Sequence, residues 1–318
     1  MGRLKVALTL LLLFLPYTGH GQTDQSSLAT RISEPATEIT KESPKFDLTP
    51  DANGNISQEQ MRQLFRIVAD KDQENDRRLR DYTYIERDVE KRLDGKGQVK
   101  STETKTYEVM EIYGEQVNRL IAKDDKPLSE KDAAKEEEKI RKVTDKRKNE
   151  SEDDRRKREA KEEKEREDGR KFVNEVADAY NFKLVGTEPV GGREAWVIDA
   201  EPRPEFVPHM KESKFLSKFR GRVWVDKTDL QLARIDAEAL DTLTFGLFLA
   251  RLHKGAHFAM EQTRVNDEVW LPLHLTYNVD ARIALLKNFR IAGEQTFRDY
   301  KKFRSSTKIV GYEEVKQP

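Results

Sequence analysis

Apolar and polar positions alternate most regularly in residues 221–236. Val223 and Val225 alternate with polar or amphipathic neighbours, the polar run Asp-Lys-Thr-Asp at 226–229 interrupts them, and Leu230 and Leu232 resume the alternation. This pattern is typical of two antiparallel strands joined by a tight turn. It predicts a hairpin near the middle of a large antiparallel sheet. The hairpin has no catalytic signature, so its pattern favours a binding function.

Alternation recurs on both sides of this hairpin. Residues 82–122 change to a two-residue period and are broken by turns at 95–97 and 113–115, which predicts three strands in a meander. Later strands are expected at 182–187, 195–200, 255–265, 269–280, 288–300 and 301–310. In the strand 269–280 one side is expected to carry Val269, Leu271, Leu273, Leu275, Tyr277 and Val279. Pro272 within it indicates a sheet edge or a bulge.

Helical periodicity follows a short polar turn at residues 51–56. The turn resembles the start of a calcium loop, but Ile56 stands where that loop needs glycine and Arg62 where it needs glutamate. Ser57 and Gln60 instead fit a capping box. Apolar residues at helical spacing then predict an amphipathic helix to about Arg80; they are Met61, Leu64, Phe65 and Val68.

Residues 129–171 are dominated by charge, with 33 charged residues among 43. Opposite charges four positions apart, such as Glu137 with Arg141 and Glu138 with Lys142, favour a solvated helix without a buried face. This charged helical insertion is either a spacer or arm that contacts a polar partner, or solvated surface without a specific role. Apolar spacing returns from Phe172 to Tyr180, where the helix is expected to dock on the main body.

The chain begins with Arg3 and Lys5, an apolar run from Val6 to Leu15, and small residues around Gly21. This order is typical of a cleaved signal peptide, and the run is about half of the roughly 20 residues that span a bilayer. The alternative is an uncleaved anchor. We expect an exported, periplasmic protein without a transmembrane span after cleavage. The expected organisation is a signal peptide at 1–21, a flexible leader at 22–56, a helix and meander at 57–128, the charged insertion at 129–171, the remaining sheet at 172–312 and a tail at 313–318.

The composition of the chain and the motifs that it lacks exclude several kinds of partner and site. Basic and acidic residues both number 59 among 318, so no net charge favours nucleic acid as a partner. Cysteine is absent, which excludes disulfides, thiolate metal sites and the lipid-bearing cysteine of a bacterial lipoprotein. His253, His257 and Glu261 could share one face of a helix, but Gly255 and the strand pattern that follows argue against a metal site. No nucleophile elbow, phosphate loop or dinucleotide fingerprint is present, so neither an enzyme nor a cofactor is expected.

Three short motifs resemble a known superfamily when taken in order. They are Gly-Arg-Glu-Ala-Trp-Val-Ile-Asp-Ala at 192–200, Gly-Arg-Val-Trp-Val-Asp at 221–226 and Val-Trp-Leu-Pro at 269–272. Together with an exported helix-then-meander, they resemble the outer-membrane lipoprotein-sorting superfamily, the Lol-type carriers and their lipoprotein-binding relatives. The likeness covers residues 57–128 and 172–312; the charged segment 129–171 is not part of the family pattern.

The resemblance implies an α+β fold, in which a strongly bent antiparallel sheet forms an incomplete β-barrel closed by helices over an apolar cavity for acyl chains. A bent sheet with more apolar residues than its helices can cover is also the usual way in which a soluble β-protein forms a lipid-sized cavity. Candidate lining residues, each of which could equally be ordinary core, are Trp196, Ile198, Val223, Val225, Leu271, Leu273 and Leu275. The apolar run 240–250 is a candidate lid, with Leu243, Phe245, Gly246 and Phe248, or else a buried connecting helix.

Two functions follow from these patterns. The first is non-covalent binding of a lipid or an acylated lipoprotein, with lipoprotein sorting to the outer membrane as the implied role. The second is an envelope sensor or scaffold on the same fold, which binds a protein partner through residues 129–171.

Overall fold

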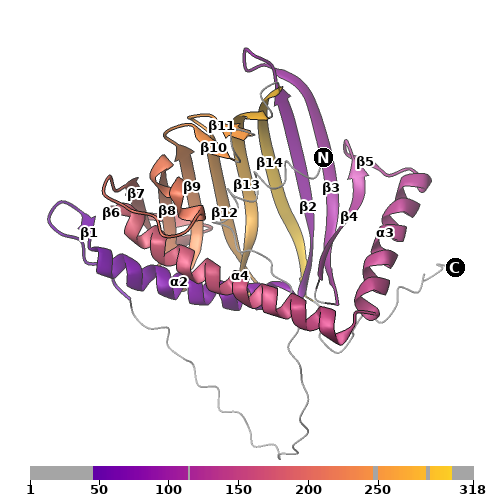
Figure 1. The fold of residues 1–318 in the computed structure, drawn as a ribbon, viewed down its shortest axis with the longest axis horizontal. Helices are drawn as coiled ribbons and strands as arrows, with labels where there is room; N and C mark the ends of the chain where they lie inside the picture. Colours follow the sequence, from indigo (N-terminus) through magenta and orange to yellow (C-terminus); the bar gives the residue numbers. More distant parts are fainter. Residues whose placement is uncertain (1–45, 114, 246–249, 284–286, 303–318) are drawn as a thin grey trace, which may run out of the picture.

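The computed structural model describes residues 46–113, 115–245, 250–283 and 287–302. The expected signal peptide, most of the leader, and the tail lie outside these residues. Within them, one antiparallel sheet of fourteen strands is accompanied by helices on one side (Figure 1). Among the described helices, none is long and apolar enough to cross a bilayer.

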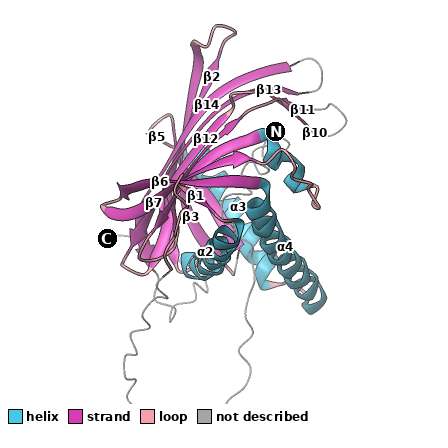
Figure 2. Cartoon of the chain, turned by 90° about the vertical axis from the view of Figure 1, so that its left-hand side faces the viewer, coloured by secondary structure: helices cyan, strands magenta, loops and turns pink. Residues whose placement is uncertain are grey.

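The sheet is open. Its strands are β1 (Asn55–Ile56), β2 (Tyr82–Leu93), β3 (Val99–Ile112), β4 (Glu115–Lys123), β5 (Lys126–Pro127), β6 (Tyr180–Val190), β7 (Arg193–Pro202), β8 (Phe219–Asp226), β9 (Leu232–Ala239), β10 (Leu243–Phe245), β11 (Ala250–Leu252), β12 (His257–Val265), β13 (Val269–Ile283) and β14 (Lys287–Lys302). Their order is β1-β6-β7-β8-β9-β12-β13-β14-β2-β3-β4-β5, with β10 and β11 paired beside β13. The pairing β14–β2 joins the end of the chain to the N-terminal meander, and Figure 2 shows the sheet bending toward the helices.

The predicted central hairpin is confirmed. Strands β8 and β9 pair antiparallel, lie fourth and fifth in the twelve-strand order, and are flanked by β7 and β12. The three-strand meander β2–β3–β4 is confirmed as well. The last predicted strands differ, because β14 continues through Lys302 where a break was expected after residue 300.

The prediction that six apolar residues of strand 269–280 share one side is wrong. Glu261 of β12 pairs with His274, whereas the next residue pairs with Pro272, so Leu273 is the extra residue of a β-bulge. One extra residue reverses the alternation, which places Val269 and Leu271 on the side opposite Leu275. Leu273 itself is 38% exposed. The proline correctly marked a bulge, but its consequence for the sides of the strand was missed.

Helix α2 (Gln58–Leu79) begins where the capping box predicts. The Ser57 hydroxyl accepts a hydrogen bond from the backbone N–H of Gln60 at 3.2 Å. Its apolar side packs with the end of helix α4 (Glu152–Ala179) on strands β6, β7 and β8. The buried members of this first cluster are Leu48, Ile56, Met61, Leu64, Phe172, Ala179, Tyr180, Phe182, Trp196, Ile198, Ala200, Leu216, Val225 and Leu230.

The charged segment forms two helices rather than one. Helix α3 (Glu130–Lys148) ends at Asn149, and Ser151 caps the start of α4 by accepting from the backbone N–H of Asp154. Glu150, between the helices, accepts from Arg158 at 2.8 Å and pairs with Arg147 at 2.9 Å. The N-caps Ser129 and Ser151 start the two helices separately, and the ion pairs of Glu150 hold the bend between α3 and α4 in place. Figure 1 shows α4 and α2 crossing the same side of the sheet, whereas α3 stands beside β4 and β5.

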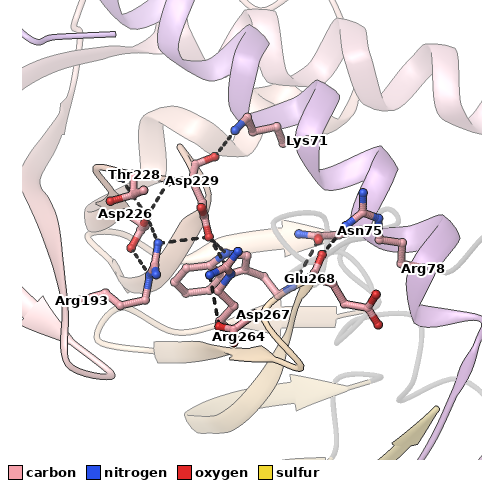
Figure 3. A network of polar contacts seen from close by, with 11 residues as sticks. Lys71, Asn75, Arg78, Arg193, Asp226, Thr228, Asp229, Arg264, Asp267 and Glu268 are labelled. Carbon is pink, nitrogen blue, oxygen red and sulfur yellow. Dashed lines mark hydrogen bonds and ion pairs between the residues drawn. The ribbon is translucent and has the colours of Figure 1, made fainter. Parts of the chain in front are cut away.

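A polar network fastens α2 to three turns of the sheet (Figure 3). Its centre is Asp229, whose carboxylate accepts from Trp270 Nε1 at 2.9 Å and pairs with Arg264 at 3.0 Å and Arg193 at 3.2 Å. The Arg193 guanidinium also donates two hydrogen bonds to the Asp226 carboxylate, at 2.7 and 3.0 Å. From α2, Lys71 donates to the backbone carbonyl of Asp229, Asn75 accepts from the Trp270 backbone N–H, and Arg78 donates to the backbone carbonyl of Glu268. Within the sheet, Arg264 also pairs with Asp267.

Candidate ligand-binding site

Cross-strand register shows that the side facing the helices changes character across the sheet. Residues directly opposite each other on paired strands share a side. One row of such partners crosses nine strands from β6 to β3: Leu184, Ile198, Val223, Ile235, Met260, Leu275, Gln295, Asp88 and Lys105. The row starts in the cluster beneath α2 and α4 and is apolar as far as β13. On β14, β2 and β3 it becomes polar.

A second row, two residues along, repeats the change. Its members from β7 to β3 are Ala200, Gly221, Ala237, Phe258, Tyr277, Gly293, Glu90 and Glu103. Both rows therefore place an apolar surface on β9, β12 and β13 directly beside a mostly acidic surface on β2 and β3, where Asp88, Glu90 and Glu103 lie with Lys105; we call this the acidic surface. The boundary between them lies on β14.

The apolar surface forms a second cluster that the long helices do not reach. Its buried members are Ile235, Ala239, Leu243, Leu252, Ala256, Phe258, Met260, Leu275, Tyr277, Val279 and Ile291. Phe215, from the short 3₁₀ helix η2 (Glu212–Lys218), and Phe219 pack against it. Among the described residues, no side chain of α2 or α4 belongs to this cluster. The sheet thus continues its apolar lining beyond the part that α2 and α4 cover.

The acidic surface centres on Asp88. Burial, reinforced by the nearby Glu90 carboxylate, raises the pKa of the Asp88 carboxyl to about 6, although Lys105 opposes this shift. Its Oδ1 atom is buried without a hydrogen-bond partner. Tyr107 lies close by, and burial together with the charge of Asp88 raises the pKa of its phenol to about 12. Burial is the main cause of both shifts, and Lys105 lies close enough to Asp88 to oppose the first of them.

Tyr277 and Gly293 form the boundary between the two surfaces. A Cβ atom on Gly293 would lie 1.9 Å from Tyr277 Cζ and 2.3 Å from its hydroxyl oxygen, so the phenol ring crosses β14 in the space that glycine leaves. The next residue of the same row is Glu90 of β2. Burial and the charges of Asp88 and Glu90 raise the pKa of the Tyr277 hydroxyl, which places that hydroxyl near the acidic surface.

The predicted lining residues are divided among three places. Trp196, Ile198 and Val225 lie in the first cluster beneath the helices, with Val223 packed against both clusters. Leu275 lies in the second cluster, whereas Leu271 packs with Tyr82 and Val269 on the far side of the bulge. Leu273 belongs to neither surface. Of the seven predicted residues, Leu275 and Val223 lie where the apolar rows extend past the helices.

The predicted lid is described only in part. Leu243 is buried in the second cluster, and β10 pairs with β11, which pairs with β13. The described part of this run consists of a bend and irregular backbone at residues 240–242, the strand β10 and the first residue of β11, so a connecting helix is wrong for it. Gly246 and Phe248 lie outside the described residues, and so does the side chain of Phe245.

The acidic surface was missed in the sequence. Strand β2 carries Glu86, Asp88 and Glu90 at the two-residue spacing that puts them on one side, a signal visible in the printed sequence. What the sequence does not show is that β2 pairs with β14, about 200 residues later, and so borders the apolar surface.

The fold and this surface define a class of protein: an open antiparallel sheet in which the long helices α2 and α4 cover one part of an apolar lining. The second part, bordered by acidic residues, packs against Phe215 and Phe219 instead. No protein-family model and no curated protein matches the sequence.

Solved structures that resemble the chain include an outer-membrane lipoprotein-sorting protein domain from Vibrio parahaemolyticus and a LolA superfamily protein from Nitrosomonas europaea. The first is 13% identical over 75% of this chain and 93% of that one, with a TM-score of 0.30. The second is 7% identical over 77% and 93%, with a TM-score of 0.28. The complex of MucA and MucB from Pseudomonas aeruginosa is 10% identical over 77% of this chain and 99% of that one, with a TM-score of 0.22. The first two are named for the superfamily that the sequence motifs resemble.

Proposed function

We propose that this protein is an exported, periplasmic binding protein that holds an acyl chain non-covalently on the apolar surface of β9, β12 and β13. One observation carries the proposal: the apolar cross-strand rows continue from the cluster beneath α2 and α4 into a second cluster that these helices do not reach. The lipoprotein-sorting role implied by the sequence resemblance is the finer form of this proposal.

Binding on such a surface needs no covalent step. Each methylene of an acyl chain that leaves water gains about 0.8 kcal/mol, so a chain of a dozen carbons supplies useful affinity after the cost of association. Phe215 and Phe219, partly buried against the second cluster, stand at its margin and can pack on the chain. The ligand would be recognised by shape and apolar contact.

The direct test is mass spectrometry of what organic solvent extracts from the purified protein, together with displacement of a fluorescent fatty-acid probe. We expect Phe219→Gln, which puts an amide at the margin of the apolar surface, to weaken probe binding. Val207→Gln is the matched control, because Val207 is 69% exposed and belongs to no apolar cluster of the described residues. A protein that yields no extracted lipid and does not bind the probe would refute the proposal.

A second candidate, a sensor or scaffold that binds a protein partner, is favoured by helix α3. None of its residues is buried, yet it is fixed to β4, because Glu136 accepts from the backbone N–H of Leu120 at 3.2 Å and Lys139 donates to Asn118 O at 2.9 Å. It is thus a charged arm held in place. Replacing its outward charges Glu137 and Arg141 with alanine should abolish partner capture if the scaffold role is correct, and should leave fatty-acid probe binding unchanged.

A further inference from the structure

The acidic surface beside the apolar one contains one carboxylate with a buried oxygen that makes no hydrogen bond. Glu103 pairs with Lys105 at 2.8 Å and with Lys123 at 3.5 Å, and Glu90 lies 3.3 Å from Arg92. Asp88 has no ion pair of this kind among the described residues; Lys105 and a hydrogen bond from Gln295 lower the pKa of its carboxyl, but its Oδ1 is buried without a hydrogen bond. A buried carboxylate oxygen without a partner is costly, which makes it a strong acceptor for a donor that a ligand brings.

The phenol of Tyr277 brings a second polar group to this place. Tyr277 is only 6% exposed, no hydrogen bond of its hydroxyl is found within the described parts of the chain, and the hydroxyl oxygen is not among their fully buried atoms that lack a partner. The ring lies across Gly293, and Glu90 is the next residue in the row, so the hydroxyl is aimed from the apolar surface toward the acidic one. The ring is thus buried while its polar end reaches the edge of the packed region, where the hydroxyl is free to accept a hydrogen bond from a ligand.

We propose that the ligand is a cationic amphiphile, whose primary ammonium group lies between Asp88 and Tyr277 while its acyl or alkyl chain occupies the apolar surface. The inference rests on the proposed function, because the same bound molecule fills both surfaces. An ammonium group has three N–H donors and no acceptor. It matches the free Asp88 oxygen and the free Tyr277 oxygen, and it is attracted to the face of an aromatic ring.

An anionic headgroup fits this place poorly. Asp88, Glu90 and Glu86 occupy alternate positions of β2 and are carried on the same side, whereas Lys105, the nearby cation of the row, is already bound to Glu103. A carboxylate or phosphate brought here would meet like charge in a partly buried setting. The charge of the surface therefore selects the sign of the headgroup.

The test compares three ligands with the same twelve-carbon chain, each below its micelle concentration and at pH 7.5: dodecylamine, dodecanoate and dodecyl maltoside. Affinities are measured by isothermal titration calorimetry on the purified protein. We expect dodecylamine to bind at least about tenfold more tightly than the other two, as a charge-assisted hydrogen bond predicts. Equal or tighter binding of dodecanoate would overturn the inference and leave the proposed function standing, whereas binding of none of the three would overturn both.

Two variants locate the headgroup. Asp88→Asn keeps the shape of the side chain and should remove the preference for dodecylamine while leaving dodecyl maltoside affinity unchanged. Glu294→Gln is the matched control, because Glu294 lies on the opposite side of the sheet, where its carboxylate contacts His274 at 2.9 Å, and should change neither affinity. If Asp88→Asn retains the full preference, as the control does, the assignment to Asp88 fails.

Discussion

At the scale of single residues, Gly293 determines the shape of the boundary between the two surfaces. Only a residue without a side chain leaves room for the Tyr277 ring, since a Cβ atom here would lie 1.9 Å from Tyr277 Cζ. We therefore expect Gly293→Ala to displace the ring and to lower the free energy of unfolding by about 1–3 kcal/mol, as overpacking does. Urea denaturation measures the change.

Gly186→Ala is the control for this substitution, because no atom lies within 4 Å of the Cβ that it would add in strand β6. The double variant Gly293→Ala with Tyr277→Ala should be more stable than the sum of the two single losses predicts. Strict additivity of the two substitutions would contradict the packing described for Tyr277.

Asp72 is a residue whose charge opposes folding. It lies on the side of α2 that faces the sheet, one helical turn after Val68 and between the network residues Lys71 and Asn75. Burial raises the pKa of its carboxyl to about 6 from an ordinary value near 3.8. The folded protein therefore binds this proton more tightly than the unfolded chain does, and ionisation of Asp72 costs stability as the pH rises from about 4 to above 6.

It follows that Asp72→Asn should stabilise the protein at pH 8 by about 1–3 kcal/mol and by a smaller amount at pH 5, where the folded wild-type carboxyl is mostly protonated. Guanidinium titrations at the two pH values measure the difference. Asp70→Asn serves as the control on the same helix. A gain that is larger at pH 5 than at pH 8 would show that the Asp72 carboxylate is stabilised by the fold.

At the scale of elements, the network around Asp229 connects helix α2 to the turns that follow β6, β8 and β12. Asp229→Ala removes one acceptor from Trp270 and a partner from both Arg193 and Arg264. Because the remaining groups are partly buried, we expect a loss of about 2–4 kcal/mol in urea denaturation. The neighbouring Asp267 is 94% exposed and pairs with Arg264 at 3.3 Å, so Asp267→Ala should change stability by less than about 0.5 kcal/mol. Equal effects of the two substitutions would show that the network is not a structural connection.

Local sequence patterns predicted single helices, hairpins and meanders well. They did not predict how strands that are far apart in the sequence pair with each other. The capped helix from Ser57, the β8–β9 hairpin and the β2–β4 meander follow from periodicity and turn chemistry that lie within about 20 residues. The reversal of sides in β13 comes from the extra residue Leu273, which has no partner in β12. It depends on how the two strands pair and not on the sequence of β13 alone. The acidic border of the site depends on the pairing of β2 with β14, which no local pattern specifies.

At the scale of the whole molecule, the sheet is stabilised unevenly. Strands β6, β7 and β8 are packed beneath α2 and α4, and the core there includes Ile198 and Val225, both fully buried. The β13–β14–β2–β3 part carries charged and phenolic side chains toward the same side, with Asp88 and Gln295 opposite each other. The proposed headgroup position thus lies in the second part, away from the strands that carry the fully buried core.

This division predicts a gradient of hydrogen exchange along the chain. Backbone amides of β7 and β8 should exchange slowly, at the rate set by global unfolding, because their strands are paired on both sides and carry the fully buried residues. Amides of α3 should exchange several orders of magnitude faster, since this helix has no buried residue and is joined to β4 by polar contacts. Hydrogen-exchange mass spectrometry of the intact protein resolves the two segments. Equal protection of α3 and β8 would contradict this prediction. It would mean that α3 makes a stabilising contact in addition to those of Glu136 and Lys139, such as a contact with a bound partner.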